Sequence, residues 1–249
     1  MTPLQIDFVS DVARPWCAVG LASFEQALKD IGDDIQVELH FQPFELNPTM
    51  APEGADAAEY LIAKYGMSRE QLAVNRQRIA ERGAAVGFTF GERKHVWNTF
   101  DAHRLLYWAG VEEPALHAPG RPKREGAPGT GRVPFVALGG SERSELGGHN
   151  RQHALKRALL QAYHGEGRNP GAHEVLLELA VAAGLDAERA RAVLKSKEFT
   201  DEVREAERFW QEAGIDGVPA VVINRRHLIQ GGQPPEVFAQ ALRKIAAEA

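Results

Sequence analysis

The sequence predicts an α/β fold in which a central mixed sheet takes strands from both ends of the chain and an all-helical domain is inserted between them. Three observations support this prediction. A strand, helix and strand pattern occupies residues 4–42, helical periodicity then dominates to about residue 194, and a strand hairpin with a final helix closes the chain. A strand–helix–strand crossover gives a parallel pair and a hairpin gives an antiparallel one, so the sheet is mixed.

The first unit follows from hydrophobic periodicity. Residues 4–9 alternate with a period close to two and are rich in branched and aromatic side chains, which predicts a buried strand. Residues 15–31 then carry apolar side chains three and four positions apart, which predicts a helix. Pro15 suits its first turn, where a missing N–H loses no intrahelical bond. Residues 37–42 alternate again and predict the second strand.

The middle and end of the chain complete the predicted domain organisation. Amphipathic helices are expected at about 55–66, 68–86, 98–109, 151–164, 172–183 and 186–196. A further helix is expected at about 198–213, strands at 220–224 and 227–230 around an Arg225-Arg226 turn, and a last helix from Pro234-Pro235 onward. The sheet domain therefore comprises residues 1–44 and 198–249, and the helical domain comprises residues 45–197.

Residues 111–150 depart from this pattern. They contain five prolines and eight glycines, without helical periodicity. Only residues 133–138 are compatible with a short strand, which Pro134 would restrict to a sheet edge. A segment of this length without regular structure is usually either functional or disordered. We expect a mobile surface excursion; a lid over the site and an aberrant piece of sequence are the alternatives.

Composition excludes several classes of function. A net charge of −5 over 249 residues gives no basic footprint for nucleic acid or for an anionic membrane surface. Residues 1–10 lack the features of a signal peptide, and no segment approaches the length of a membrane span, so we expect a cytoplasmic protein. The single cysteine, Cys17, excludes an intramolecular disulfide and a cysteine-rich zinc site. No metal site is predicted.

Five short segments in register resemble a known family. They are residues 11–17 (Asp-Val-Ala-Arg-Pro-Trp-Cys), 44–48 (Phe-Glu-Leu-Asn-Pro), 98–105 (Asn-Thr-Phe-Asp-Ala-His-Arg-Leu), 217–219 (Gly-Val-Pro) and 230–235 (Gln-Gly-Gly-Gln-Pro-Pro). Together they resemble the DsbA-like branch of the thioredoxin superfamily and, within it, the FrnE-like subgroup. The resemblance implies a thioredoxin fold with thiol–disulfide oxidoreductase activity.

The resemblance also implies a Cys-Pro-Trp-Cys active site, whose first cysteine corresponds to Arg14 in this sequence. That position lies at a helix N-terminus, where unpaired N–H groups and the helix dipole stabilise the attacking thiolate. The second cysteine corresponds to Cys17 and would resolve the mixed disulfide. With Arg14 in the first position, we expect disulfide exchange within one chain to be impaired.

Two interpretations of Cys17 remain open. It is either a small apolar side chain packed under the helix, or a single thiol made more acidic by the helix N-terminus and by Arg14. Arg14 likewise is either a solvated surface charge or a group that holds an anion together with helix N–H donors. Cys17, Arg14 and Pro219 are the candidate catalytic residues.

The candidate substrate-binding residues are Pro15, Trp16, Val218, Asn98, His103, Gly232 and Gln233. The resemblance implies a cis Val218-Pro219 bond facing the Pro15-Trp16-Cys17 turn, beside which an extended peptide or glutathione pairs. Gly232 and Gln233 offer close backbone approach and N–H donors to an anion. Asn98 and His103 lie on a predicted helix whose polar face is expected to line the cleft.

The sequence leaves three functions open. The first is the impaired oxidoreductase, acting on an extended peptide or on protein thiols and disulfides. The second comes from the related kappa-class glutathione transferases and 2-hydroxychromene-2-carboxylate isomerases, and would make glutathione a co-substrate. The third is a non-enzymatic peptide-binding or chaperone module. No tightly bound cofactor is expected, and a homodimer is an open alternative to a monomer.

Overall fold

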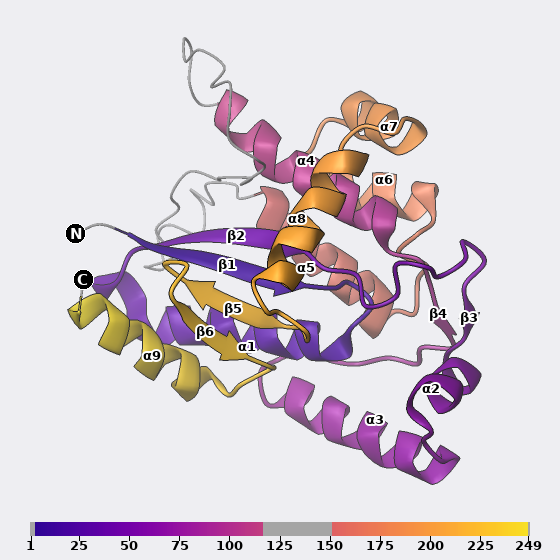
Figure 1. Ribbon diagram of the computed structural model, residues 1–249, viewed down its shortest axis with the longest axis horizontal. Helices are drawn as coiled ribbons and strands as arrows, with labels where there is room; N and C mark the ends of the chain where they lie inside the picture. The colour runs from indigo at the N-terminus through magenta and orange to yellow at the C-terminus, as the bar shows by residue number, and fades with distance from the viewer. Residues whose placement is uncertain (1–2, 117–150, 249) are drawn as a thin grey trace.

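A four-stranded mixed sheet forms the centre of the sheet domain in the computed structural model, which describes residues 3–116 and 151–248. Its order is β2 (Val37–Pro43), β1 (Leu4–Ser10), β5 (Ala220–Ile223) and β6 (His227–Gln230). β1 and β2 are parallel, and β1–β5 and β5–β6 are antiparallel (Figure 1). Strands from both ends of the chain therefore meet in one sheet, which confirms the predicted fold class.

Helices cover both faces of this sheet. α1 (Pro15–Ile31) packs against α9 (Pro235–Ala247) on one face, where the rings of Phe24 and Phe238 meet edge to face at 5.5 Å. α8 (Thr200–Glu212) lies on the side of the sheet away from these two helices and contacts β2 (Figure 1). Apolar side chains from all these elements form one continuous core.

The inserted segment is mainly helical, as predicted. It contains α2 (Ala57–Tyr65), α3 (Arg69–Ala84), α4 (Phe100–Leu116), α5 (Arg151–Leu160), a π-helical turn η2 (Gln161–Gly165), α6 (His173–Ala182) and α7 (Ala187–Lys195). A short 3₁₀ turn, η1 (Gly32–Asp34), ends α1. The helices α4 to α7 enclose a second core around Trp108 and Tyr163, which also receives Val12 from the β1–α1 loop.

Local signals explain several helix boundaries. Ser68 caps α3 through a reciprocal capping box with Gln71, and Asp56 accepts the first N–H groups of α2. Gly66, in the left-handed region with φ 65°, ends α2. α2 and α3 form a helical arm, which Figure 1 shows beside the N-terminal part of α1.

Two details of the insertion differ from the prediction. β3 (Ala55–Asp56) and β4 (His95–Val96) form a two-residue antiparallel pair, too short to leave a periodic pattern in the sequence. α4 continues to Leu116 through a stretch that was expected to lack helical structure. The rest of the expected excursion, including the short strand at residues 133–138, lies outside the described residues.

Over residues 3–116 and 151–248, we find no helix with the length and apolar character that crossing a bilayer requires. Within the same residues, no three His, Cys, Asp or Glu side chains are grouped so that they could hold a metal ion.

Candidate functional site

Arg14 is the residue from which α1 starts. It has an extended backbone (φ −98°, ψ 118°) as the N-cap, and Pro15 follows at the first helical position. The Cys17 N–H donates to the Arg14 carbonyl at 2.9 Å, and the Ala13 N–H donates to the Asp11 carboxylate at 2.9 Å. The loop after β1 is therefore fixed by local hydrogen bonds.

Cys17 is fully buried beneath the first turn of α1. Burial raises the pKa of its thiol to about 12, and the charges of Lys156 and Arg14 lower it only in part. The sequence-based alternative of a more acidic thiol is therefore wrong, because desolvation outweighs the nearby positive charges. Cys17 packs as a small apolar side chain within the sheet core.

A cavity of about 640 Å³ opens beside the start of α1. Residues 13–16 form one wall, α2 and α3 form a second, and residues 90–93 form a third. Of the predicted site residues, Arg14, Pro15 and Trp16 line it. The residue at the position of the family's attacking cysteine thus borders a space large enough for an organic ligand.

Two arginines that line this cavity form hydrogen bonds with neighbouring residues. Arg14 Nη1 donates to the Tyr65 hydroxyl at 3.1 Å, while its Nε is buried and has no hydrogen-bond partner among the described residues. Arg93 Nη1 donates to the Ala13 carbonyl at 2.9 Å, and its guanidinium lies 5.3 Å from the centre of the Tyr163 ring. Both side chains are half-buried, so their charges are less screened than those of exposed arginines.

The C-terminal half of the predicted site packs against α1. The Val218-Pro219 bond is cis. A Cβ on Gly20 would come within 2.8 Å of the Pro219 ring, so this close approach requires glycine. A Cβ on Gly232 would come within 3.1 Å of the Trp16 carbonyl oxygen. These segments therefore meet around the first turns of α1, as the resemblance implies for Pro219.

These C-terminal residues do not line the cavity. The Pro219 carbonyl accepts the Gly231 N–H at 2.8 Å, and the Gly232 carbonyl accepts from Arg82 at 3.0 Å. The Gln233 side chain donates to the Gln230 carbonyl at 2.8 Å. The substrate-binding roles of Val218, Gly232 and Gln233 stay predictions.

Asn98 and His103 were expected to line the cleft, and the structure places both elsewhere. Asn98 caps α4, because its side-chain oxygen accepts the Phe100 N–H at 2.9 Å and its amide donates to the Met50 carbonyl at 2.8 Å. The side chain of His103 is 1% exposed and points toward Asp11, with 3.6 Å between Nε2 and Oδ1. Both residues position the loops around the site and neither borders the cavity.

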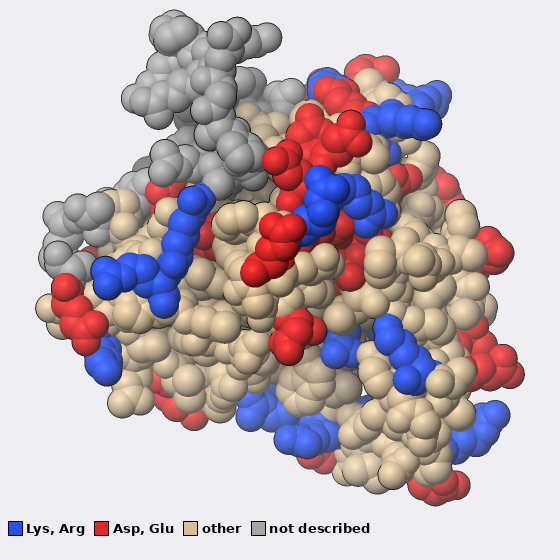
Figure 2. Space-filling model, viewed as in Figure 1, with Lys and Arg blue, Asp and Glu red and all other residues tan. Residues whose placement is uncertain are grey.

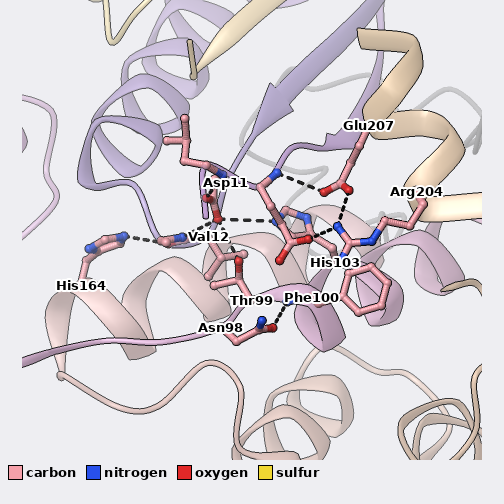
Figure 3. A network of polar contacts seen from close by, with 12 residues as sticks. Asp11, Val12, Asn98, Thr99, Phe100, His103, His164, Arg204 and Glu207 are labelled. Atoms are coloured by element: carbon pink, nitrogen blue, oxygen red, sulfur yellow. Dashed lines mark hydrogen bonds and ion pairs between the residues drawn. The ribbon is translucent and has the colours of Figure 1, made fainter. Parts of the chain in front are cut away.

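Asp11 is the centre of the polar network drawn in Figure 3. Its carboxylate accepts hydrogen bonds from the Leu46 N–H at 2.9 Å and the Thr99 hydroxyl at 3.0 Å, besides the Ala13 N–H. Burial alone would raise the pKa of Asp11, but His103 and these backbone donors lower it below its usual value. A buried carboxylate therefore ties the loop before α1 to α4 and to the loop after β2.

A second part of the network connects the loop after β2 to α8. The Glu45 N–H donates to the Glu207 carboxylate at 3.1 Å, and Arg204 contacts the carboxylates of both residues. Figure 3 shows Arg204 and Glu207 side by side. Burial, together with the negative charge of Glu207, raises the pKa of Glu45 to about 7, although His103 and Arg204 oppose the shift. Glu45 Oε1 has no partner among the described residues.

Behind the loop, His164 from η2 lies 2.9 Å from the Val12 carbonyl through Nε2 (Figure 3). Burial lowers the pKa of His164 to about 3, so the neutral ring donates this bond. Burial also lowers the pKa of Lys156 on α5 to about 8, although the negative charge of Asp11 opposes the shift. Sequence reasoning missed both residues, since nothing in their local pattern distinguishes them from other helical positions.

Comparison with known proteins identifies the family. Residues 5–120 and 145–243 match the DSBA-like thioredoxin domain. The chain belongs to this family. The mixed sheet and the cis Val218-Pro219 bond described above agree with this assignment. This is a family of DsbA-like thiol–disulfide oxidoreductases.

Three relatives illustrate the similarity. A crystal structure described as a probable DsbA oxidoreductase from Streptomyces coelicolor is 34% identical, with a TM-score of 0.76 over 99% of this chain and 91% of that one. The Bacillus subtilis protein YwbO, described as uncharacterized, is 24% identical over 96% of each chain. A 2-hydroxychromene-2-carboxylate isomerase shares the fold, with 14% identity, a TM-score of 0.62 and coverage of 98% and 97%.

Proposed function

We propose that this DsbA-like protein is of the FrnE-like type, that it works in the cytoplasm, and that disulfide exchange by its own thiol is impaired. One observation supports the proposal above all. The position that requires an attacking thiolate holds Arg14, and the only thiol of the chain is buried with a pKa of about 12. Because the thiolate is the nucleophile of disulfide exchange, a thiol that stays protonated at neutral pH does not start the reaction.

The test is the reduction of insulin disulfides by dithiothreitol, measured for the wild type and for Arg14→Cys. We expect the wild type to follow the uncatalysed rate and the variant to exceed it by tenfold or more, since the variant has two cysteines at the family's spacing. Arg226→Cys is the matched control, because it adds a cysteine at an exposed turn far along the chain from Cys17. A wild-type rate above the uncatalysed rate would contradict the impairment, and an Arg14→Cys rate no higher than that of the wild type would contradict Arg14 as its cause.

We propose a second function at the same position, in which glutathione is an external thiol co-substrate. The cavity beside Arg14 favours it, because the space adjoins the start of α1 and Arg14 supplies a cation for a carboxylate of glutathione. Thermal unfolding with millimolar glutathione tests it, since a ligand selective for the folded state raises the melting temperature. An unchanged melting temperature would remove this second function and leave the first one standing.

A further inference from the structure

The cavity beside Arg14 has walls of two chemical kinds. Aromatic and aliphatic side chains make up much of the lining, among them Trp16, Leu61, Tyr65, Leu72 and Phe90. Its volume of about 640 Å³ lies in the range of sites that enclose small organic ligands. Such walls gain free energy from an apolar ligand surface, because removing apolar area from water is favourable. The shape and composition favour a ligand with an apolar body.

The polar part of the lining is predominantly cationic. Four arginines border the cavity, namely Arg14, Arg76, Arg78 and Arg93. Glu92 is the one carboxylate among the lining residues that the structure describes, and it pairs with Lys94 at 3.6 Å. Figure 2 shows Lys and Arg side chains along the edge of the molecule formed by α3, the helix that carries Arg76 and Arg78. The excess of guanidinium groups favours a negatively charged ligand.

Arg14 is the cation best placed to hold the charged group. Its Nε is buried and unpartnered, which costs free energy unless a ligand accepts the hydrogen bond. The helix backbone supplies less than usual here, because Pro15 has no N–H and the Cys17 N–H already donates to the Arg14 carbonyl. The side chain, and not the helix N-terminus alone, therefore provides the donors at this end of the cavity.

We infer that this cavity binds an amphipathic organic anion, with a single acidic head group at Arg14 and an apolar body against Trp16, Tyr65 and Phe90. On binding, the hydrogen bond from Arg14 Nη1 to the Tyr65 hydroxyl would be replaced by one from Nη1 to the ligand. The inference rests on the proposed use of the Arg14 cavity as the ligand site, and it names a ligand class distinct from glutathione. Carboxylate and sulfonate head groups share the required chemistry, since both accept paired guanidinium hydrogen bonds.

The test uses two fluorescent probes that differ only in the acidic group. These are 8-anilinonaphthalene-1-sulfonate and N-phenyl-1-naphthylamine, which lacks the sulfonate. We expect Arg14→Gln to raise the dissociation constant of the anion tenfold or more and to change that of the neutral probe less than about threefold. Arg226→Gln removes an exposed arginine outside the cavity and should leave both constants unchanged. Equal effects of Arg14→Gln on the two probes, or no effect on either, would overturn the inference.

A second measurement needs no variant. Dodecanoate should displace the anionic probe from the wild-type protein at least tenfold more effectively than dodecanol, and equal displacement would overturn the inference. Glutathione is added in a separate arm of the same titration. Failure of glutathione to displace the probe, with dodecanoate still effective, removes only the glutathione proposal. Binding of glutathione without binding of dodecanoate removes only this inference.

Discussion

The backbone N–H of Glu45 donates to the carboxylate of Glu207 at 3.1 Å, so two acidic residues from distant parts of the chain lie side by side in a buried site. Arg204 bridges them, and its guanidinium lies 3.9 Å from the centre of the Phe100 ring. One arginine shared by two carboxylates leaves an excess of negative charge. Together with burial, this excess makes Glu45 an acid that holds its proton near neutral pH.

Glu45 should make the protein less stable as pH rises through the neutral range. Its pKa is about 7 in the folded protein against an ordinary value of 4.5, so the folded state binds the proton more tightly. The contribution to stability is complete below pH 4.5 and is lost as pH rises to about 7, on the order of 2–3 kcal/mol in all. We expect Glu45→Gln to remove this slope in the free energy of unfolding measured from pH 5 to 8. Glu53→Gln, at an exposed site, should preserve it, and a persisting slope in Glu45→Gln would contradict the assignment.

Asp11 should make the protein less stable as pH falls into the acid range. Its folded pKa lies below the ordinary value of 3.8, so its contribution is present above that value and is lost as pH falls through the folded pKa. Asp11→Asn keeps one acceptor oxygen for the three donors and should cost about 2 kcal/mol or more at pH 7. Urea unfolding at pH 3 and pH 7 measures both effects. Asp34→Asn, an exposed control, should change neither, and an Asp11→Asn variant as stable as wild type would refute the role.

Cys17 should be unreactive in the native protein. It is fully buried and its pKa is about 12, so a thiol reagent at pH 8 meets neither an accessible sulfur nor a thiolate. Ellman's reagent should label Cys17 only after denaturation, at a rate that follows unfolding. The added thiol of Arg226→Cys should react within the mixing time in the same experiment. Rapid native labelling of the wild type would show that the first turn of α1 opens readily.

Gly20→Ala should destabilise the protein although alanine is the better helix former. A Cβ at this position would lie 2.8 Å from the Pro219 Cγ and 3.5 Å from the Gly232 Cα. We expect the resulting strain to exceed the helix-propensity gain of about 1 kcal/mol and to leave a net loss of about 1–2 kcal/mol. Thermal unfolding of the wild type and of Gly20→Ala measures this net loss of stability. Gly217→Ala has no atom within 4 Å of its added Cβ and should be nearly neutral; a similar loss there would argue against the clash.

Much of the fold could be predicted from the sequence because its long elements have clear periodicity. α1 begins at Pro15 and ends at Ile31, as the apolar spacing predicts. The parallel β1–β2 pair and the β5–β6 hairpin follow from the same kind of pattern. The two-residue strands β3 and β4 left no such pattern, since two positions do not establish a period.

The site was less predictable, because its walls depend on contacts between distant segments. The spacing of Asn98 and His103 suggests a shared helix face, but it does not say whether that face meets the cavity or Asp11. Tyr65 contacts Arg14 although the two residues are 51 positions apart in the sequence, and no local sequence pattern predicts that contact. The burial of Cys17 depends in the same way on the packing of α1 against the whole sheet.

Gln152 shows how the inserted segment completes the sheet. Its side chain accepts the N–H of Phe41 at 3.1 Å and donates to the carbonyls of Phe41 and Leu106 at 3.2 and 3.1 Å. It thereby gives partners to the main chain of Phe41 on β2, an edge strand whose unpaired groups could pair with another chain. During synthesis, β1, α1 and β2 leave the ribosome more than a hundred residues before Gln152. The growing chain therefore passes through a stage in which the main chain of Phe41 lacks this partner.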